Sequence, residues 1–196
     1  MIKLAVVAAL LPVPCAALAQ RPPLTLPSRD VSVVYRVEGG AREAIPGGIP
    51  ETLQVDWSAP LQALRLTPQG RNQVLLLDLT TSSLKMVDTG LHSAIDLPVR
   101  PKDLDPVKLR DARLTRTGAE TIVGRQCTDY TVESRRGHGT ICLTDDGVAL
   151  RAAGEVNGRQ GSFTAISVAY ERLPDSLFAV PQGFSSFSIP GLTRMR

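Results

Sequence analysis

The sequence contains few aromatic residues and no concentrated block of basic charge, and both shortages limit the functions it can support. Aromatic residues make up 4% of the 196 residues, and the basic residues are spread along the chain among acidic ones. Nucleic-acid binding needs a clustered basic stripe or aromatic stacking platforms, so we do not expect it here. The formal charge of +3 falls to +2 when Lys3 is subtracted with the leader described below.

Motifs of metal-dependent and nucleophilic enzymes are also missing. His92 and His138 are the two histidines, each isolated, and no His-x-x-x-His, Cys-x-x-Cys or acidic metal loop occurs. We therefore predict neither a metal nor a cofactor. Ser185 and Ser186 lack the Gly-x-Ser-x-Gly elbow of hydrolases. Asp145-Asp146-Gly147 is typical of a turn between strands, so we predict no catalytic residue and no enzymatic activity.

Long apolar runs are confined to the N-terminus, where the pattern is that of a secretory signal peptide. Lys3 supplies a positive start, residues 4–13 an apolar segment, and Ala17-Leu18-Ala19 a small-x-small cleavage site. The apolar segment is shorter than the roughly 20 residues that a membrane-spanning helix needs. Pro14 before Cys15 does not fit a lipid-attachment site. We expect cleavage after Ala19 and a periplasmic or secreted protein without a transmembrane segment.

Two cysteines remain once the leader is removed, Cys127 and Cys142. An even number of cysteines in an oxidising compartment predicts a disulfide between them. Each cysteine lies in a short alternating run, and a polar turn separates the two runs, so we expect a disulfide-closed hairpin.

Alternation of apolar and polar residues recurs along the mature chain and indicates strands. In residues 30–38 the side chains of Val31, Val33, Tyr35 and Val37 fall on one face. Residues 73–80 are apolar on both faces, which is typical of a strand covered on both sides. The pattern predicts an all-β sheet, sandwich or barrel. The other expected strands are 51–57, 61–66, 83–88, 113–117, 120–124, 126–133, 137–144, 148–156 and 160–172.

Two segments break this pattern and predict short helices. Residues 91–98 form one, and a second begins at Asp105, which is placed as an N-cap before Pro106.

The register of the predicted hairpin follows from its cysteines. If Cys127 and Cys142 lie directly opposite each other, Asp129 pairs with Thr140 and Thr131 pairs with His138. This register places Tyr130 and Ile141 on the opposite, more apolar face, as a one-sided sheet requires. A bulged turn at Gly137 is the alternative, and it would make the cysteine pairing diagonal.

The apolar stripe of the first strands has two interpretations. It forms an ordinary core, or it forms a concave apolar sheet face that holds a lipid or an acyl chain. The second interpretation predicts a set of ligand-lining residues on that face. They are Val33, Tyr35, Leu53, Val55, Trp57, Leu64, Leu66 and Tyr130.

The C-terminal half resembles a known family of exported bacterial domains. The quoted segments are ETIVGRQC (120–127) with Tyr130, CLTDDGVALR (142–151) and LPDSLFAVPQGF (173–184). In order and spacing they are similar to uncharacterised exported domains related to the LolA/LolB-like lipoprotein-carrier fold. The resemblance covers about 65 residues. It implies a curved antiparallel half-barrel whose inner face can hold acyl chains, and it implies no catalytic residue.

Taken together, these observations predict a mainly β protein with a curved antiparallel sheet of about 9 to 11 strands, one or two short helices and one disulfide. We expect a signal peptide (1–19), an extended arm (20–28), one half-barrel domain (29–188) and a C-terminal tail (189–196). The predicted function is a periplasmic binding module for a lipid, an acyl chain or a lipidated peptide. The alternative is a structural protein of the cell envelope with a filled core and a protein partner.

Overall fold

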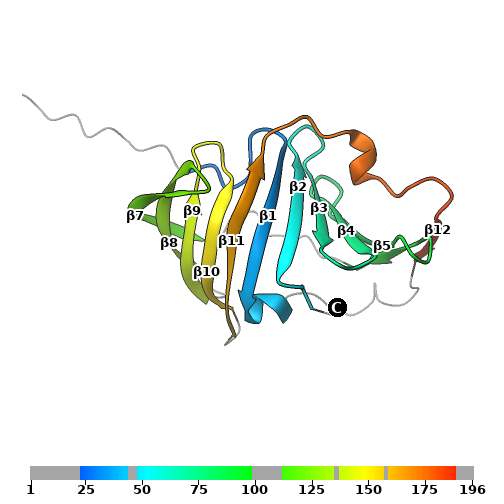
Figure 1. Ribbon diagram of the computed structural model, residues 1–196, viewed down its shortest axis with the longest axis horizontal. Helices are drawn as coiled ribbons and strands as arrows, with labels where there is room; N and C mark the ends of the chain where they lie inside the picture. Colours follow the sequence, from blue (N-terminus) through cyan, green and yellow to red (C-terminus); the bar gives the residue numbers. More distant parts are fainter. Residues whose placement is uncertain (1–22, 44–47, 99–111, 135–136, 157–158, 189–196) are drawn as a thin grey trace, which may run out of the picture.

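A computed structural model describes residues 23–43, 48–98, 112–134, 137–156 and 159–188, which form one curved twelve-stranded sheet (Figure 1). The strands of the first half are β1 (Val31–Gly39), β2 (Thr52–Ser58), β3 (Ala63–Pro68), β4 (Gln73–Asp78), β5 (Ser83–Asp88) and β6 (Ser93–Leu97). Those of the second half are β7 (Arg113–Ile122), β8 (Arg125–Ser134), β9 (Gly137–Leu143), β10 (Ala149–Val156), β11 (Arg159–Ala169) and β12 (Ser185–Ser188). Two short 3-10 segments complete the described part, η1 (Gly40–Glu43) and η3 (Asp175–Phe178). The predicted class, a mainly β half-barrel, is confirmed.

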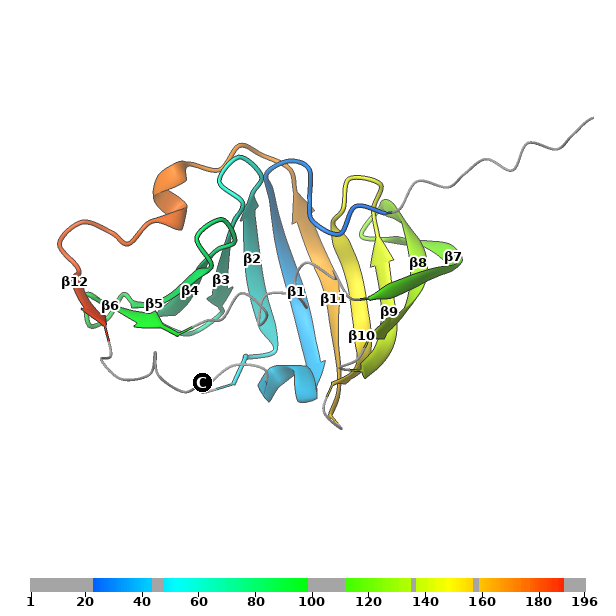
Figure 2. The same cartoon turned by 180° about the vertical axis from the view of Figure 1, so that it is seen from behind.

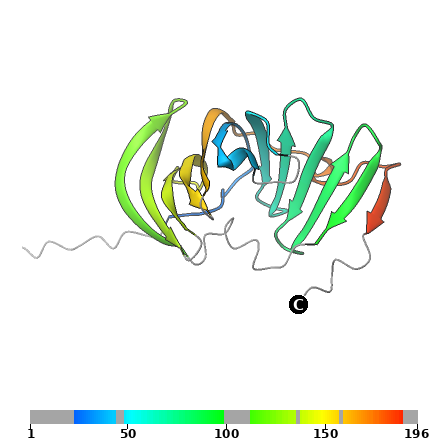
Figure 3. The ribbon, with the colours of Figure 1, turned by 90° about the horizontal axis from the view of Figure 1, so that it is seen from below.

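The strand order joins two meanders. The first runs outward from β1 to β6, and the second runs inward from β7 at the far edge to β11, which pairs with β1. Seen from behind, β1 and β11 lie side by side where the two meanders meet (Figure 2). All neighbours are antiparallel except β12, which adds to the edge of β6 in parallel. Viewed from below, the sheet curves from β7 round to β12 (Figure 3).

The first meander is held in register by three similar loops. Pairs Ser58–Ala63, Asp78–Ser83 and Asp88–Ser93 each enclose four residues. The last residue of each loop, Gln62, Ser82 or His92, has a positive φ. Because a one-residue slip would move every side chain to the opposite face, these loops fix which residues face inward.

The sheet has two apolar faces, and each is covered differently. On the inner, concave face Val37 and Leu53 pack with Ile49 and with Ala41 of η1. On the outer face Val74, Leu76, Val87 and Ala94 are buried under Val180 and Phe184 of the segment that follows β11. Strand β4 is therefore buried on both faces, as its sequence predicts.

A row of four glycines crosses four neighbouring strands near one end of each. Gly139, Gly154, Gly161 and Gly39 are paired in sequence across β9, β10, β11 and β1. A Cβ atom on Gly154 would lie 2.6 Å from the His138 carbonyl oxygen and 2.9 Å from the Gly139 Cα. The neighbouring backbones approach so closely here that only glycine fits.

The disulfide between Cys127 and Cys142 is confirmed, but the predicted register of its hairpin is wrong by two residues. The structure pairs Cys142 with Asp129, Thr140 with Thr131 and His138 with Glu133. Gly137 pairs with Ser134, so the turn lies one residue further along the chain than predicted and the disulfide runs diagonally between the strands. The alternative at Gly137 predicted this diagonal pairing, but the β8–β9 pairing contains no bulge. A shift of two residues leaves each side chain on its expected face, because side chains alternate with a period of two.

The predicted helix at residues 91–98 is also wrong. Ser93–Leu97 form β6, which continues the meander through the same loop type that precedes β3 and β5. The pattern of this segment is too short to separate the helical period from alternation. The second predicted helix begins in a segment that lies outside the described residues, as do the leader (1–19) and the tail (189–196).

Candidate functional site

The inner face of the first meander carries two parallel rows of apolar side chains that run across the strands. Members of a row face each other directly in neighbouring strands, so they form continuous apolar bands from β2 toward β12. Row one consists of Trp57, Leu64, Leu77, Leu84 and Leu97. Row two consists of Val55, Leu66, Leu75, Met86, Ile95 and Phe187.

Exposure along these rows is lowest at Trp57 and in β4, and it is highest in β12. Trp57 is 3% exposed, and Leu77 and Leu75 of β4 are 7% and 9% exposed. The half-buried members are Val55, Leu64, Leu66, Leu84, Met86, Ile95 and Leu97, whereas Phe187 in β12 is 56% exposed. Row one therefore begins at a closed end at Trp57, and row two finishes at an open end in β12.

The structure brings the eight predicted lining residues onto one face of the sheet, in three settings. Val33, Leu53 and Trp57 are almost completely buried within the protein. Val55, Leu64 and Leu66 are half-buried members of the two rows. Tyr35 and Tyr130 belong to the remainder of the inner face.

Tyr35 stabilises the fold through contacts of its ring and of its hydroxyl. The hydroxyl donates a hydrogen bond of 2.7 Å to the Ala149 carbonyl, and the ring meets Phe163 edge-on. Burial raises the pKa of Tyr35, with a smaller contribution from Tyr170, so the phenol stays neutral and acts as a donor.

Tyr130 lies far across the sheet from Trp57. It belongs to a row that continues through Ile141, Ala152 and Phe163 to Val37. Both Tyr130 and Ile141 are half-buried. Tyr130 shares the inner face with the other predicted residues, but strands β9, β10 and β11 lie between it and β1.

The sequence interpretation missed the outer half of the rows. Residues 91–98 were assigned to a helix, which concealed Ile95 and Leu97, and Phe187 lies in a short serine-rich segment without alternation of its own. The signal that reveals them is the repeated loop length between strands. Equal four-residue loops join β4 to β5 and β5 to β6, so the inward-facing positions of β4 determine those of β6.

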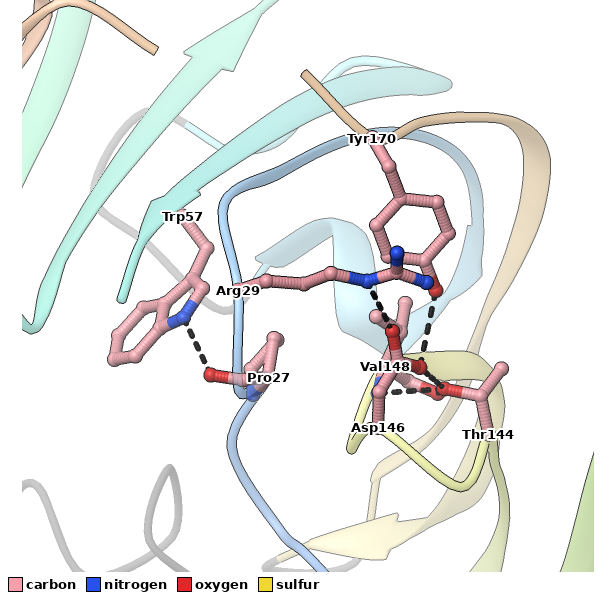
Figure 4. Close-up of polar contacts among 7 residues, drawn as sticks. All are labelled: Pro27, Arg29, Trp57, Thr144, Asp146, Val148 and Tyr170. Atoms are coloured by element: carbon pink, nitrogen blue, oxygen red, sulfur yellow. Dashed lines mark hydrogen bonds and ion pairs between the residues drawn. The ribbon is translucent and has the colours of Figure 1, made fainter. Parts of the chain in front are cut away.

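The N-terminal strap, residues 24–30, closes the Trp57 end of the inner face. Leu26 packs against the core that contains Trp57 and Val31. The Trp57 indole N–H donates a 2.8 Å hydrogen bond to the Pro27 carbonyl (Figure 4). Asp30 accepts hydrogen bonds from the backbone N–H groups of Ala59 and Leu173, at 2.9 and 3.2 Å.

Asp146 fastens the strap to the β9–β10 turn. Its carboxylate accepts hydrogen bonds from Arg29 Nε at 2.8 Å, the Tyr170 hydroxyl at 3.1 Å and the Thr144 hydroxyl at 2.5 Å (Figure 4). Burial alone would raise the pKa of Asp146, but these donors outweigh it and hold the pKa below its usual range. The Arg29 guanidinium also stacks on the Tyr170 ring, 3.8 Å from its centroid.

The disulfide lies beside an ion-pair cluster. Arg151 Nη2 lies 2.5 Å from Glu120 Oε1 and 3.5 Å from Asp129 Oδ1. Both cysteines are almost fully buried. One Glu120 oxygen and the two sulfurs lie within 4.8 Å of one another. Because the sulfurs are bonded to each other and Arg151 engages the carboxylate, this group stabilises the hairpin rather than presenting thiolate ligands.

A polar hollow of about 270 Å³ opens next to this cluster, lined by residues of β7 and β8 with Asp145. It lies apart from the apolar rows, which belong to β2–β6 and β12. None of the helical segments in the described ranges is long and apolar enough to cross a membrane.

These features define a class: a curved, open antiparallel half-barrel with an apolar inner face and one disulfide. No protein-family model and no curated protein matches the chain. Among solved structures it is similar to an uncharacterized conserved protein from Thermus thermophilus. That match has 11% identity and a TM-score of 0.53, covering 83% of this chain and 91% of the other.

Two further solved structures match with lower TM-scores. A LolA superfamily protein from Nitrosomonas europaea matches at 12% identity and a TM-score of 0.40, covering 80% of this chain and 92% of that one. A chain of the Pseudomonas aeruginosa MucA/MucB complex matches at 17% identity and a TM-score of 0.41. Here the match covers 76% of this chain and 55% of the other. At these identities the likeness concerns the fold alone.

Proposed function

We propose that the protein is a non-enzymatic binding module that acts outside the cytoplasm and holds a lipid, an acyl chain or a lipidated peptide on its inner face. The observation that carries the proposal is the set of half-buried apolar side chains that the two rows present on a concave surface, with Phe187 exposed at the β12 end. The predicted lining residues Val55, Leu64 and Leu66 lie in those rows.

Contact between water and the apolar rows favours the binding of an apolar ligand. Contiguous apolar patches on soluble proteins mark binding sites, because leaving them in water is unfavourable. Covering apolar area contributes about 25 cal/mol per Å². The outer face of β4–β6 shows the same kind of surface already covered by Val180 and Phe184. We infer that a ligand performs this role on the inner face.

The proposal is tested with a fluorescent long-chain fatty acid and the mature protein. We expect saturable binding that Met86→Gln weakens about tenfold, because an amide buried against an acyl chain loses hydrogen bonds to water. Val34→Gln is the matched control, since Val34 is half-buried on the outer face of β1. It should leave binding unchanged.

Absence of binding by the wild-type protein would contradict the proposal, and so would equal losses in the two variants. Circular dichroism and unfolding midpoints of both variants show that a loss reflects the site rather than misfolding.

The proposed location and the domain limits have a separate test. N-terminal sequencing of exported protein should begin at Gln20 if the leader is removed after Ala19. A start at Met1 in exported material would contradict the leader, and a start elsewhere would move its boundary.

One observation favours the alternative, a protein partner. Strand β7 forms one edge of the sheet and is mostly exposed over its ten residues. Such an edge can accept an added strand from another chain. The bulge between Arg116 and Gly118 and the charges of Arg113 and Arg116 oppose this, because natural edges use these features to prevent pairing. The apolar rows therefore support the ligand proposal better.

A further inference from the structure

The two apolar rows contain no charged side chain, although charged residues lie on the same strands. Arg65, Lys85 and Asp96 project from the outer face, where they occupy one row with Asp56 and Leu76. Lys85 and Asp96 form an ion pair there. Burying an unpaired charge along the inner rows would be costly. Only the uncharged part of a ligand can lie along them.

The ends of the rows differ in polarity. At one end Trp57 is 3% exposed, and the strap closes it through Leu26 and the bond from the indole to Pro27. At the other end Phe187 is 56% exposed in β12, where all four side chains are exposed and three are serines. A chain lying along the rows can therefore end in water only on the β12 side.

A polar row borders the apolar rows on the same face. It consists of Gln73, Asp88, Ser93 and Ser185, paired in sequence from β4 to β12. Asp88 is its charged member, and it accepts hydrogen bonds from the Gln73 amide and from the backbone N–H groups of Gly90 and Leu91. These bonds, that of Gln73 first, hold the pKa of Asp88 below its usual value. A carboxylate here attracts a positive group and repels a negative one.

We infer that the ligand is an amphiphile with a long acyl chain that binds tail-first, with its tail end beside Trp57 and a zwitterionic or cationic polar end at the β12 edge. This inference rests on the proposed function and adds the class and orientation of its ligand. The rows cross five strand spacings from β2 to β12, or about 24 Å, a length suited to a long acyl chain.

Trp57 provides the test, because it is the only tryptophan of the chain. The mature protein is titrated with lysophosphatidylcholine brominated either near the tail end or near the head group, since bromine quenches a tryptophan only at short range. We expect the tail-end label to quench Trp57 at least about threefold more strongly at saturation. Equal quenching by both labels, or stronger quenching by the head-group label, would overturn the orientation.

The polar end is tested by competition. Unlabelled lysophosphatidylcholine should displace the tail-labelled probe more effectively than a fatty-acid anion of the same chain length, by about threefold, and added salt should reduce this preference. A preference for the anion would overturn the assignment of the polar end.

Phe187 and Val123 form a matched pair for the open end of the rows. Both are exposed apolar residues, at 56% and 44%, but Val123 lies between β7 and β8, outside the rows. Phe187→Ser should weaken binding about threefold through lost apolar contact, and Val123→Ser should not. Equal effects would overturn the path along the rows. If no probe binds to the wild-type protein, the proposed function itself is wrong. If the probes bind but the two bromine labels quench Trp57 equally, only the proposed orientation is wrong.

Discussion

At the scale of single residues, Asp146 shows how one side chain can join distant parts of a chain. Its three donors come from the strap, from the β9–β10 turn and from the residue that follows β11. The sequence predicts only a turn at Asp145-Asp146-Gly147, which is correct for the backbone. It cannot predict the bond to Arg29, which lies 117 positions away, because nothing local to either residue specifies the other.

The Asp146 carboxylate should contribute to stability near neutral pH. We expect Asp146→Asn to lower the free energy of unfolding by about 1–2 kcal/mol, because hydrogen bonds to a charged group are lost. The folded-state pKa of Asp146 lies below its unfolded value. The contribution is therefore present above the unfolded pKa of about 3.9 and is lost as pH falls through the folded pKa.

Urea unfolding of wild type and Asp146→Asn at neutral and acidic pH measures this difference. The gap between the two proteins should shrink below about pH 4. Asp145→Asn, a change at the exposed neighbour, serves as the control. A gap that persists unchanged into acid would show that the charge of Asp146 is not the cause.

At the scale of elements, the disulfide hairpin shows what pattern reasoning can and cannot determine. The cysteine pair and the face of each side chain were predictable, because oxidising export and period-two alternation specify them. The residue that pairs with each cysteine across the hairpin was not predictable, because a shift of two residues along a strand preserves the alternation. The pairing of Gly137 with Ser134 sets the register that makes the disulfide diagonal.

Removal of the disulfide should destabilise the protein. Replacing both Cys127 and Cys142 by alanine opens a loop whose ends are 15 positions apart. The chain-entropy model gives a loss of about 3 kcal/mol. Chemical unfolding of the double variant measures it.

A thiol count on the unreduced, denatured protein without its leader gives an independent check. It should find no free thiol, because the proposed leader carries Cys15. Two free thiols in exported protein would contradict the disulfide.

At the scale of the whole molecule, the glycine row marks the place where four neighbouring strands approach most closely. A side chain at Gly154 or Gly139 would collide with the backbone of the neighbouring strand, so glycine lets these strands pack closely near one end. The sequence shows these glycines, but their alignment across four strands emerges only from the register. The apolar rows are similar, because each residue is visible in the sequence while its neighbours in the row are not.

Gly154→Ala should therefore destabilise the fold by about 1–3 kcal/mol, as overpacking against backbone atoms cannot be relieved by rotating a side chain. Gly118→Ala is the control, since a Cβ there would meet only Asp129 Oδ2, at 3.6 Å. Unfolding midpoints compare the two variants. Similar losses would show that strand propensity, rather than close packing, explains the effect.

The strand order also has a consequence for how the protein is made. Each meander consists of hairpins between neighbours in sequence, and such local contacts form quickly. The seam between β1 and β11 joins residues more than 120 positions apart, so it closes after most of the chain has been synthesised. Until then one edge of β1 has no partner, and its apolar side chains make it prone to aggregate. If the chain is exported unfolded, as the proposed leader implies, a chaperone that shields β1 until β11 arrives should reduce aggregation.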